Sequence, residues 1–179
     1  MSGNRRHRFI GSAIYDIPFL ADQKGVLGAV LGGWQVSGVI SIRSGEPLRL
    51  SQASGIGNSR PDYNGGNQVF DDWRDTLQYL DRSAYTLVPT YPRTTATVRP
   101  GTQNAGQLEA PGRRRVDLTL AKSFTLHGRM QLQVRAESFN AFNWRQYNDP
   151  VTNITAANFG RITSVSATRT GQVGFRLTF

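Results

Sequence analysis

The last nine residues, Gly171-Gln172-Val173-Gly174-Phe175-Arg176-Leu177-Thr178-Phe179, alternate between two kinds of side chain. Val173, Phe175, Leu177 and Phe179 are apolar, and the residues between them are small or polar. A period of two residues is the side-chain period of a β-strand, so this segment predicts a strand with one apolar face. In water such a face would form an aggregation-prone edge. It is the required pattern for a strand with lipid on one side and a wet lumen on the other.

Four earlier segments show a similar alternation. The predicted strands lie near residues 7–19, 33–43, 115–125, 130–143 and 171–179. In the third, Val116, Leu118, Leu120 and Phe124 share the apolar face, which Lys122 interrupts. The first strand is the least clearly two-sided, because Ile10 and Ile14 fall on its wetter face. The sequence therefore predicts an all-β fold: an antiparallel meander of about five amphipathic strands, forming part of a transmembrane β-barrel.

The hairpin between the third and fourth strands can be tested by parity, because residues paired across a hairpin project from the same face. A two-residue turn at His127-Gly128 would pair Leu120 with Arg135, which mixes the faces. A three-residue loop over residues 126–128 preserves both faces and places Gly128 where a positive φ is favoured. It predicts these pairs: Phe124 with Met130, Leu120 with Val134, and Leu118 with Ala136.

Two long polar segments, residues 44–112 and 144–170, separate the strands. We expect short helical turns near Val26–Leu31 and within residues 70–85, where Trp73, Leu77 and Leu80 are spaced by four and three. Long connections fall on one side of the meander and short ones on the other. In a barrel the long loops are extracellular, so Phe179 is predicted to end at the periplasmic side.

Composition excludes several classes of protein. No stretch approaches the ~20 apolar residues of a membrane-spanning helix, and the absence of cysteine removes disulfides and thiol chemistry. The net charge of +9 comes from scattered arginines rather than a basic stripe, so we expect no nucleic-acid partner. Residues 1–8 contain no apolar core of a secretion signal, so we expect that the chain lacks its natural beginning.

An ordered set of short motifs resembles the C-terminal end of TonB-dependent receptors, especially the Oar-like branch. The motifs cover nearly the whole chain: Arg6-His7-Arg8-Phe9, Tyr15-Asp16-Ile17-Pro18-Phe19, Gly32-Gly33-Trp34-Gln35-Val36-Ser37-Gly38, Ser44-Gly45-Glu46-Pro47, Asn104-Ala105-Gly106, Ala110-Pro111-Gly112, Val116-Asp117-Leu118, Lys122-Ser123-Phe124, Arg135-Ala136-Glu137-Ser138-Phe139-Asn140 and Asn158-Phe159-Gly160-Arg161-Ile162. Each motif is weak alone. The ordered set, ending in Phe179, is more specific.

The resemblance implies an outer-membrane protein whose relatives form plugged barrels of about 22 strands and import scarce nutrients. This chain has about five predicted strands, and the smallest bacterial barrels need about eight. Residues 1–179 are therefore expected to be a C-terminal barrel segment that does not transport alone. The implied partners are outer-membrane lipid, the rest of the barrel and its plug, the barrel assembly machinery and, through the missing N-terminal region, the inner-membrane TonB system. The substrate cannot be read from this segment.

Three sets of residues are candidates for a role in such a barrel. The resemblance marks the terminal row Val173, Phe175, Leu177 and Phe179 as an assembly signal. The aromatic residues Tyr15, Trp34 and Phe124 suit the girdle at a membrane interface. The inward polar residues are Asp117, Thr119, Arg135, Glu137 and Arg176; we expect their charges to compensate one another across neighbouring strands, because unpaired inward charges are costly.

No catalytic or cofactor site is predicted. His7 and His127 lack metal-ligand spacing, no serine has a matching histidine and carboxylate, and Asp71, Asp72 and Asp75 lack the EF-hand pattern. Trp73, Tyr79, Tyr85 and Tyr91 could form an aromatic platform for a ligand, but packing within the loop is favoured. We therefore expect neither enzymatic activity nor a cofactor or metal.

One alternative class stays open. A soluble β-sandwich module that binds a ligand such as carbohydrate would bury the apolar rows against a second sheet, although this chain supplies few strands for two sheets.

Overall fold

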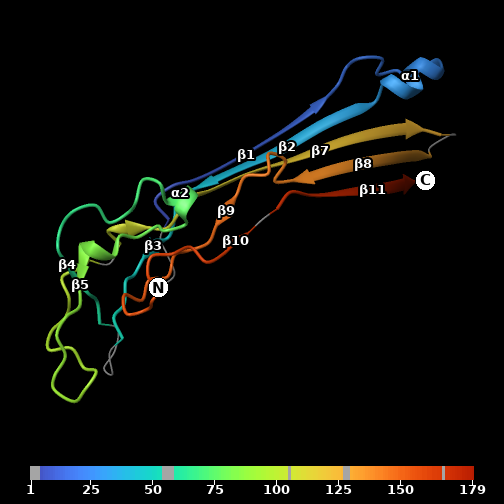
Figure 1. The fold of residues 1–179 in the computed structure, drawn as a ribbon. Coiled ribbons are helices and arrows are strands. Elements are labelled where there is room, and N and C mark those ends of the chain that lie inside the picture. Colours follow the sequence, from blue (N-terminus) through green and yellow to red (C-terminus); the bar gives the residue numbers. More distant parts are fainter. Residues whose placement is uncertain (1–4, 54–58, 105, 127–129, 167) are drawn as a thin grey trace. The chain divides into compact units, whose positions relative to one another are not determined.

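The computed structural model describes residues 5–53, 59–104, 106–126, 130–166 and 168–179 (Figure 1). The chain divides into two compact units. The sheet unit comprises Arg8–Arg43, Arg113–Arg145 and Ala167–Phe179, and the loop unit comprises Met1–His7, Ser44–Gly112 and Gln146–Ser166.

The sheet unit is built on five antiparallel strands in the order β1-β2-β7-β8-β11. They are β1 (Arg8–Asp16), β2 (Trp34–Arg43), β7 (Arg113–Thr125), β8 (Gln131–Phe139) and β11 (Thr170–Thr178). Strands that follow one another in this list are hydrogen-bonded neighbours, which confirms the predicted five-stranded meander (Figure 1). β1 and β11 are the two edges, so the described sheet is open rather than a closed barrel.

The register places the predicted apolar rows on one face of the sheet. Phe9 lies opposite Ile42, Val36 opposite Leu120, and Phe175 opposite Val134. Directly opposed residues share a face, so the apolar rows join across all five strands. The other face carries the polar rows. It also holds Ile10 and Ile14, the two apolar residues that were predicted to lie on the wetter face of the first strand.

The register of the β7–β8 hairpin differs from the prediction by two residues. Phe124 pairs with Leu132, Leu120 with Ala136 and Leu118 with Ser138. The predicted faces are correct, because a slip of two residues preserves parity, but the predicted partners are wrong. The amide of Leu126 donates to the oxygen of Met130 at 3.0 Å, so Leu126 continues the ladder instead of opening the loop. The predicted positive φ at Gly128 and the position of His127 lie outside the described residues.

The connection between β1 and β2 holds a helix, α1 (Gly25–Leu31), close to the predicted turn at Val26–Leu31. It ends at Gly32, whose amide donates to the oxygen of Gly28 at 2.9 Å. In the described part of the chain, every helix is too short or too polar to cross a membrane.

The loop unit has short paired strands and a hydrophobic core, whereas the sequence predicted irregular loops at 44–112 and 144–170. The pairs are β3 (Pro47–Leu48) with β6 (Leu108–Glu109), β4 (Asp62–Tyr63) with β5 (Tyr85–Thr86), and β9 (Gln146–Tyr147) with β10 (Val165–Ser166). The helix expected within residues 70–85 is reduced to α2 (Trp73–Thr76) and the 3-10 turn η1 (Arg82–Ala84).

The core of the loop unit collects residues from distant parts of the sequence. Leu80, Ile154 and Ile162 are at most 2% exposed, and Leu48, Leu50 and Leu108 pack in the same cluster. These positions follow neither a two-residue nor a 3.6-residue period, so periodicity gave no sign of them.

Candidate functional surface

The terminal strand presents its apolar row to the outside of the sheet unit. Val173, Phe175, Leu177 and Phe179 are 65%, 74%, 46% and 83% exposed. Within β11, Val173, Phe175 and Leu177 lie opposite Ala136, Val134 and Leu132 of β8. The row therefore extends the apolar surface of β8 to the edge of the sheet. An exposed apolar surface of this kind marks a contact with lipid or with another protein.

Apolar side chains in the middle of the sheet are also exposed. Val36 and Leu120, opposite each other on the central strands β2 and β7, are 39% and 41% exposed, and Leu118 is 40% exposed. Central strands of a water-soluble sheet normally bury one face against another layer. In this sheet the apolar face is the one that would be buried, yet its central side chains are more exposed to solvent than those of a packed core.

The opposite face carries ion pairs that run along strands. Arg115 Nε lies 2.6 Å from Asp117 Oδ1, and Arg135 Nη2 lies 2.5 Å from Glu137 Oε1. We predicted that these charges would pair between neighbouring strands. Instead, most of them pair with a residue two positions away on the same strand, because such residues are neighbours on one face. Contacts between neighbouring strands also occur on this face: the Gln172 amide on β11 donates to Glu137 on β8, and the Gln35 amide on β2 donates to Asp16 on β1 at 2.6 Å.

The remaining two residues of the predicted polar set lie on the same face. Thr119 is directly opposite Glu137, and Arg176 is opposite Gln133. The register therefore brings all five predicted residues, Asp117, Thr119, Arg135, Glu137 and Arg176, to one side of the three strands β7, β8 and β11.

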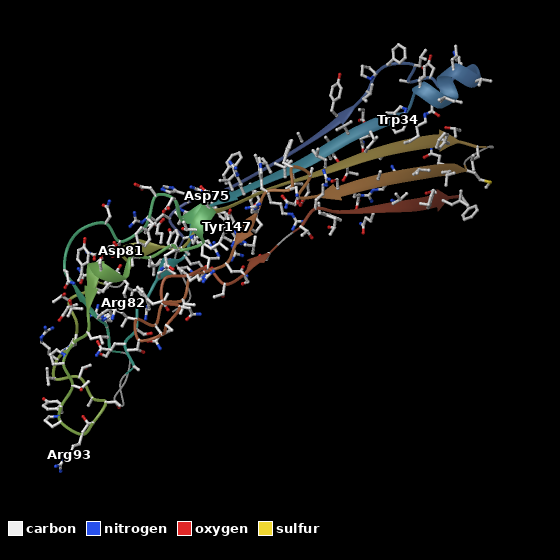
Figure 2. The ribbon with its side chains drawn as sticks, viewed as in Figure 1. Trp34, Asp75, Asp81, Arg82, Arg93 and Tyr147 are labelled. Carbon is white, nitrogen blue, oxygen red and sulfur yellow. The ribbon has the colours of Figure 1, made fainter. Side chains whose placement is uncertain are left out.

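The predicted girdle aromatics gather at one end of the apolar face. Tyr15 is opposite Val36, Trp34 opposite Lys122, and Phe124 opposite Leu132, all close to the end where α1 and the C-terminus lie (Figure 1). Tyr15 is 63% exposed, and the indole nitrogen of Trp34 donates to the oxygen of Val30 at 3.1 Å. Figure 2 shows Trp34 beside α1.

Lys122 interrupts the apolar row, and the structure explains how the charge is accommodated. Its side chain is only 3% exposed, and its ammonium group donates to the main-chain oxygen of Gly32. The same nitrogen lies 5.6 Å from the centre of the Trp34 ring and 4.9 Å from that of Phe124. A carbonyl and two aromatic faces are favourable surroundings for a cation removed from water.

A corner after β8 was missed by the sequence reasoning. Asn140 is 1% exposed and has φ 51°; its side-chain oxygen accepts from the Trp144 amide at 3.1 Å and its side-chain nitrogen donates to the Trp144 oxygen at 3.0 Å. This turn stacks Phe142 on Trp144 with ring centres 5.3 Å apart, and Arg114 lies 4.4 Å over the Trp144 ring. The signal was available: asparagines at 140 and 143 are among the few non-glycine residues that readily adopt positive φ.

In the loop unit, most of the candidate aromatic platform is buried. Trp73, Tyr79 and Tyr85 are 8%, 7% and 3% exposed, whereas Tyr91 is 53% exposed. Trp73 makes edge-to-face contacts with Tyr79 at 5.0 Å and with Tyr147 at 4.9 Å. Burial raises the pKa of Tyr79 and of Tyr85. The predicted packing role is confirmed for the three buried rings, and a ligand platform built from all four is ruled out.

An ion pair ties together distant parts of the loop unit. The Arg99 guanidinium lies 2.7 Å from Asp62 Oδ2, and the Thr102 amide donates to Asp62 Oδ1 at 3.0 Å. The hydrogen bond from Arg99 lowers the pKa of the Asp62 carboxyl.

An open hollow of about 550 Å³ in the loop unit is lined by Gln78, Arg82, Leu87 and Ile154, among others. Its Gln78 amide is already used, donating to the oxygens of Leu80 and Phe159, each at 2.9 Å. Within the described ranges, no group of three or more histidine or acidic side chains could hold a metal ion.

A family model described as "Outer membrane beta barrel domain" matches residues 1–172. No curated protein and no solved structure matches the chain.

Proposed function

Because the chain belongs to the outer membrane beta barrel domain family, and hence to the bacterial outer membrane, we propose that it forms the C-terminal wall of a TonB-dependent receptor-like barrel. The observation that carries this proposal is the two-sidedness of the sheet unit. Its apolar face is exposed even on the central strands, while the other face holds Arg115–Asp117 and Arg135–Glu137 ion pairs. A barrel wall needs lipid outside and a polar lumen inside, and it needs both faces on the same strands.

The receptor-like part of the proposal rests on the ordered motifs, which end at Phe179. In this role the barrel assembly machinery recognises the apolar row of β11, and the polar face of the sheet lines the lumen. The edges β1 and β11 pair with further strands of the complete barrel. Transport then requires the rest of the barrel, its plug and the inner-membrane TonB system. We propose no enzymatic activity for the segment.

The soluble β-sandwich alternative is disfavoured by exposure. It requires the row containing Val36, Leu118 and Leu120 to be covered by a second sheet, yet these side chains are 39–41% exposed. A sandwich core buries such residues almost completely.

A labelling experiment tests the orientation of the two faces. Because the chain has no cysteine, Leu120→Cys and Thr119→Cys each introduce a unique thiol on opposite faces of the same strand. Each full chain is labelled with a polarity-sensitive fluorophore in outer membranes that carry lipids with a nitroxide on the acyl chain. The probe at 120 should be quenched severalfold more than the probe at 119. Equal quenching would overturn the proposal.

The gene provides a separate test of the receptor assignment. The sequence upstream of the codon for Met1 should encode more amphipathic strands and a plug domain, in frame or as a frameshifted remnant. An upstream region with neither would contradict the receptor-like assignment while leaving the outer-membrane barrel family intact.

A further inference from the structure

Helix α1 has the reverse of the side-chain distribution expected for a helix packed on a protein. Val26, Leu27, Val30 and Leu31 are 82%, 72%, 57% and 45% exposed, and the buried residue of the helix is Gly28. The four apolar residues are spaced by three and four, so they form one stripe. A helix on a water-soluble surface turns such a stripe towards the core.

Glycines hold the opposite side of the helix against the preceding segment. A Cβ at Gly28 would lie 2.7 Å from the carbonyl carbon of Gln23, and one at Gly32 would lie 1.8 Å from the oxygen of Leu20. Only residues without a side chain allow this approach. The small face of α1 is therefore committed to its own connection, and the apolar stripe is directed outwards.

Hydrogen bonds tie this connection to the sheet, among them one from the Ser123 amide to the oxygen of Gly33 at 3.1 Å. Trp34 donates to the oxygen of Val30, Lys122 donates to that of Gly32, and the Gln23 side chain donates to that of Ser123 at 2.9 Å. The side chains of Trp34 and Lys122 belong to the apolar face of the sheet. The end of α1 is thus held on the apolar side of the sheet.

We propose that α1 inserts this stripe into the boundary between the headgroups and acyl chains of the outer-membrane leaflet next to the α1 end of the sheet. The inference rests on the proposed function, in which the apolar face of the sheet contacts lipid. A seven-residue helix is about 10 Å long, too short to span a bilayer but suited to lie in its interface. Asp22 and Lys24, with side chains 81% and 88% exposed, precede the stripe and stay in water.

The periplasmic end of a barrel borders the inner, phospholipid leaflet. Phe179 is predicted to end at the periplasmic side, and α1 lies at the same end of the sheet (Figure 1). We therefore assign the inner leaflet as the lipid that α1 contacts. In this role α1 fixes the depth of the sheet in the membrane, with Trp34 and Phe124 at the same interface.

The test uses the same outer membranes with nitroxide-bearing lipids, and three single-cysteine chains that carry the fluorophore. Leu27→Cys reports on the helix, Asp22→Cys is the matched control in the same connection, and Leu120→Cys reports on the sheet. The probe at 27 should be quenched by lipid nitroxides severalfold more than the probe at 22, with a blue-shifted emission. Val26→Cys, at the most exposed position of the stripe, repeats the measurement should the Leu27 variant fail to assemble.

The outcomes separate the two proposals. If the probe at 120 is quenched and the probe at 27 behaves like that at 22, the helix inference is overturned and the barrel-wall proposal stands. If the probe at 27 is blue-shifted but not quenched, a protein covers the helix and the lipid assignment is overturned. If the probes at 120 and 27 are both unquenched, the barrel-wall proposal fails and the helix inference fails with it.

Discussion

Lys122 and Gly32, 90 residues apart, are joined by a hydrogen bond from the lysine ammonium group to the glycine's main-chain oxygen. The contact attaches the connection after β1 to the middle strand of the sheet. It also makes a lysine compatible with an otherwise apolar row.

Replacing Lys122 with methionine tests this attachment. Lys122→Met keeps the length of the side chain but leaves a carbonyl without its charged donor, so we expect a loss of about 1–3 kcal/mol in the free energy of unfolding. The measurement is the urea midpoint of the assembled chain. Lys24→Met, at an exposed site on the same connection, is the control and should leave the midpoint nearly unchanged. Equal midpoints would show that the Gly32 contact does not stabilise the fold.

The role of the C-terminal aromatic can be tested by deletion. Removing Phe179 from the complete barrel protein should lower the amount assembled in the outer membrane severalfold, because the terminal apolar row loses the member that is 83% exposed. Thr178→Ser, a change on the other face of the same strand, is the control. Unchanged assembly after the deletion would argue against an assembly signal at this position.

The ion pair between Arg135 and Glu137 should contribute little to stability. Although its atoms are 2.5 Å apart, the Arg135 side chain is 49% exposed, so water screens the attraction. A double-mutant cycle with Arg135→Ala and Glu137→Ala should give a coupling energy of about 1 kcal/mol or less. A much larger value would mean that this face is drier than its exposure indicates.

Gly160 is expected to be essential to the core of the loop unit. It has φ 77°, and a Cβ there would lie 2.4 Å from the main-chain oxygen of Leu80, a fully buried residue. Gly65 also has a positive φ, at 92°, but has open space around it. Both Gly→Ala variants should lose about 1–2 kcal/mol to backbone strain, and Gly160→Ala should lose clearly more. Thermal unfolding of the two variants measures the difference; equal losses would show that the backbone at Leu80 can move.

The loop unit should lose part of its stability in acid through Asp62. Arg99 lowers the pKa of this carboxyl, so the folded state favours the ionised form. The contribution is present above the unfolded pKa near 3.8 and is lost as the pH falls through the lowered folded value. Asp62→Asn should flatten the acid limb of the stability curve, and Asp71→Asn, at an exposed site, should not. The same acid limb in the wild type and Asp62→Asn would exclude this linkage.

The sequence was most informative where one physical demand repeats along the chain. The alternation of residues such as Val173, Phe175 and Leu177 predicted both the strands and their faces, because each side chain has only two directions in which to point. It could not choose between hairpin registers two residues apart, since both keep the faces intact. The pairing of Leu120 with Ala136 rather than Val134 was decided by the continuation of the ladder to Leu126 and Met130.

Only the tertiary structure decided the features that depend on residues far apart in the chain. The loop-unit core joins Leu48, Leu80 and Ile154, which share no periodicity. The burial of Lys122 depends on a carbonyl 90 residues earlier. The outward stripe of α1 depends on Gly28 and Gly32 meeting the backbone of Leu20 and Gln23. The sequence by itself determined which face of each strand is apolar, because that follows from local geometry. The partners, the loop core and the direction of α1 are set by packing between segments, which local pattern does not encode.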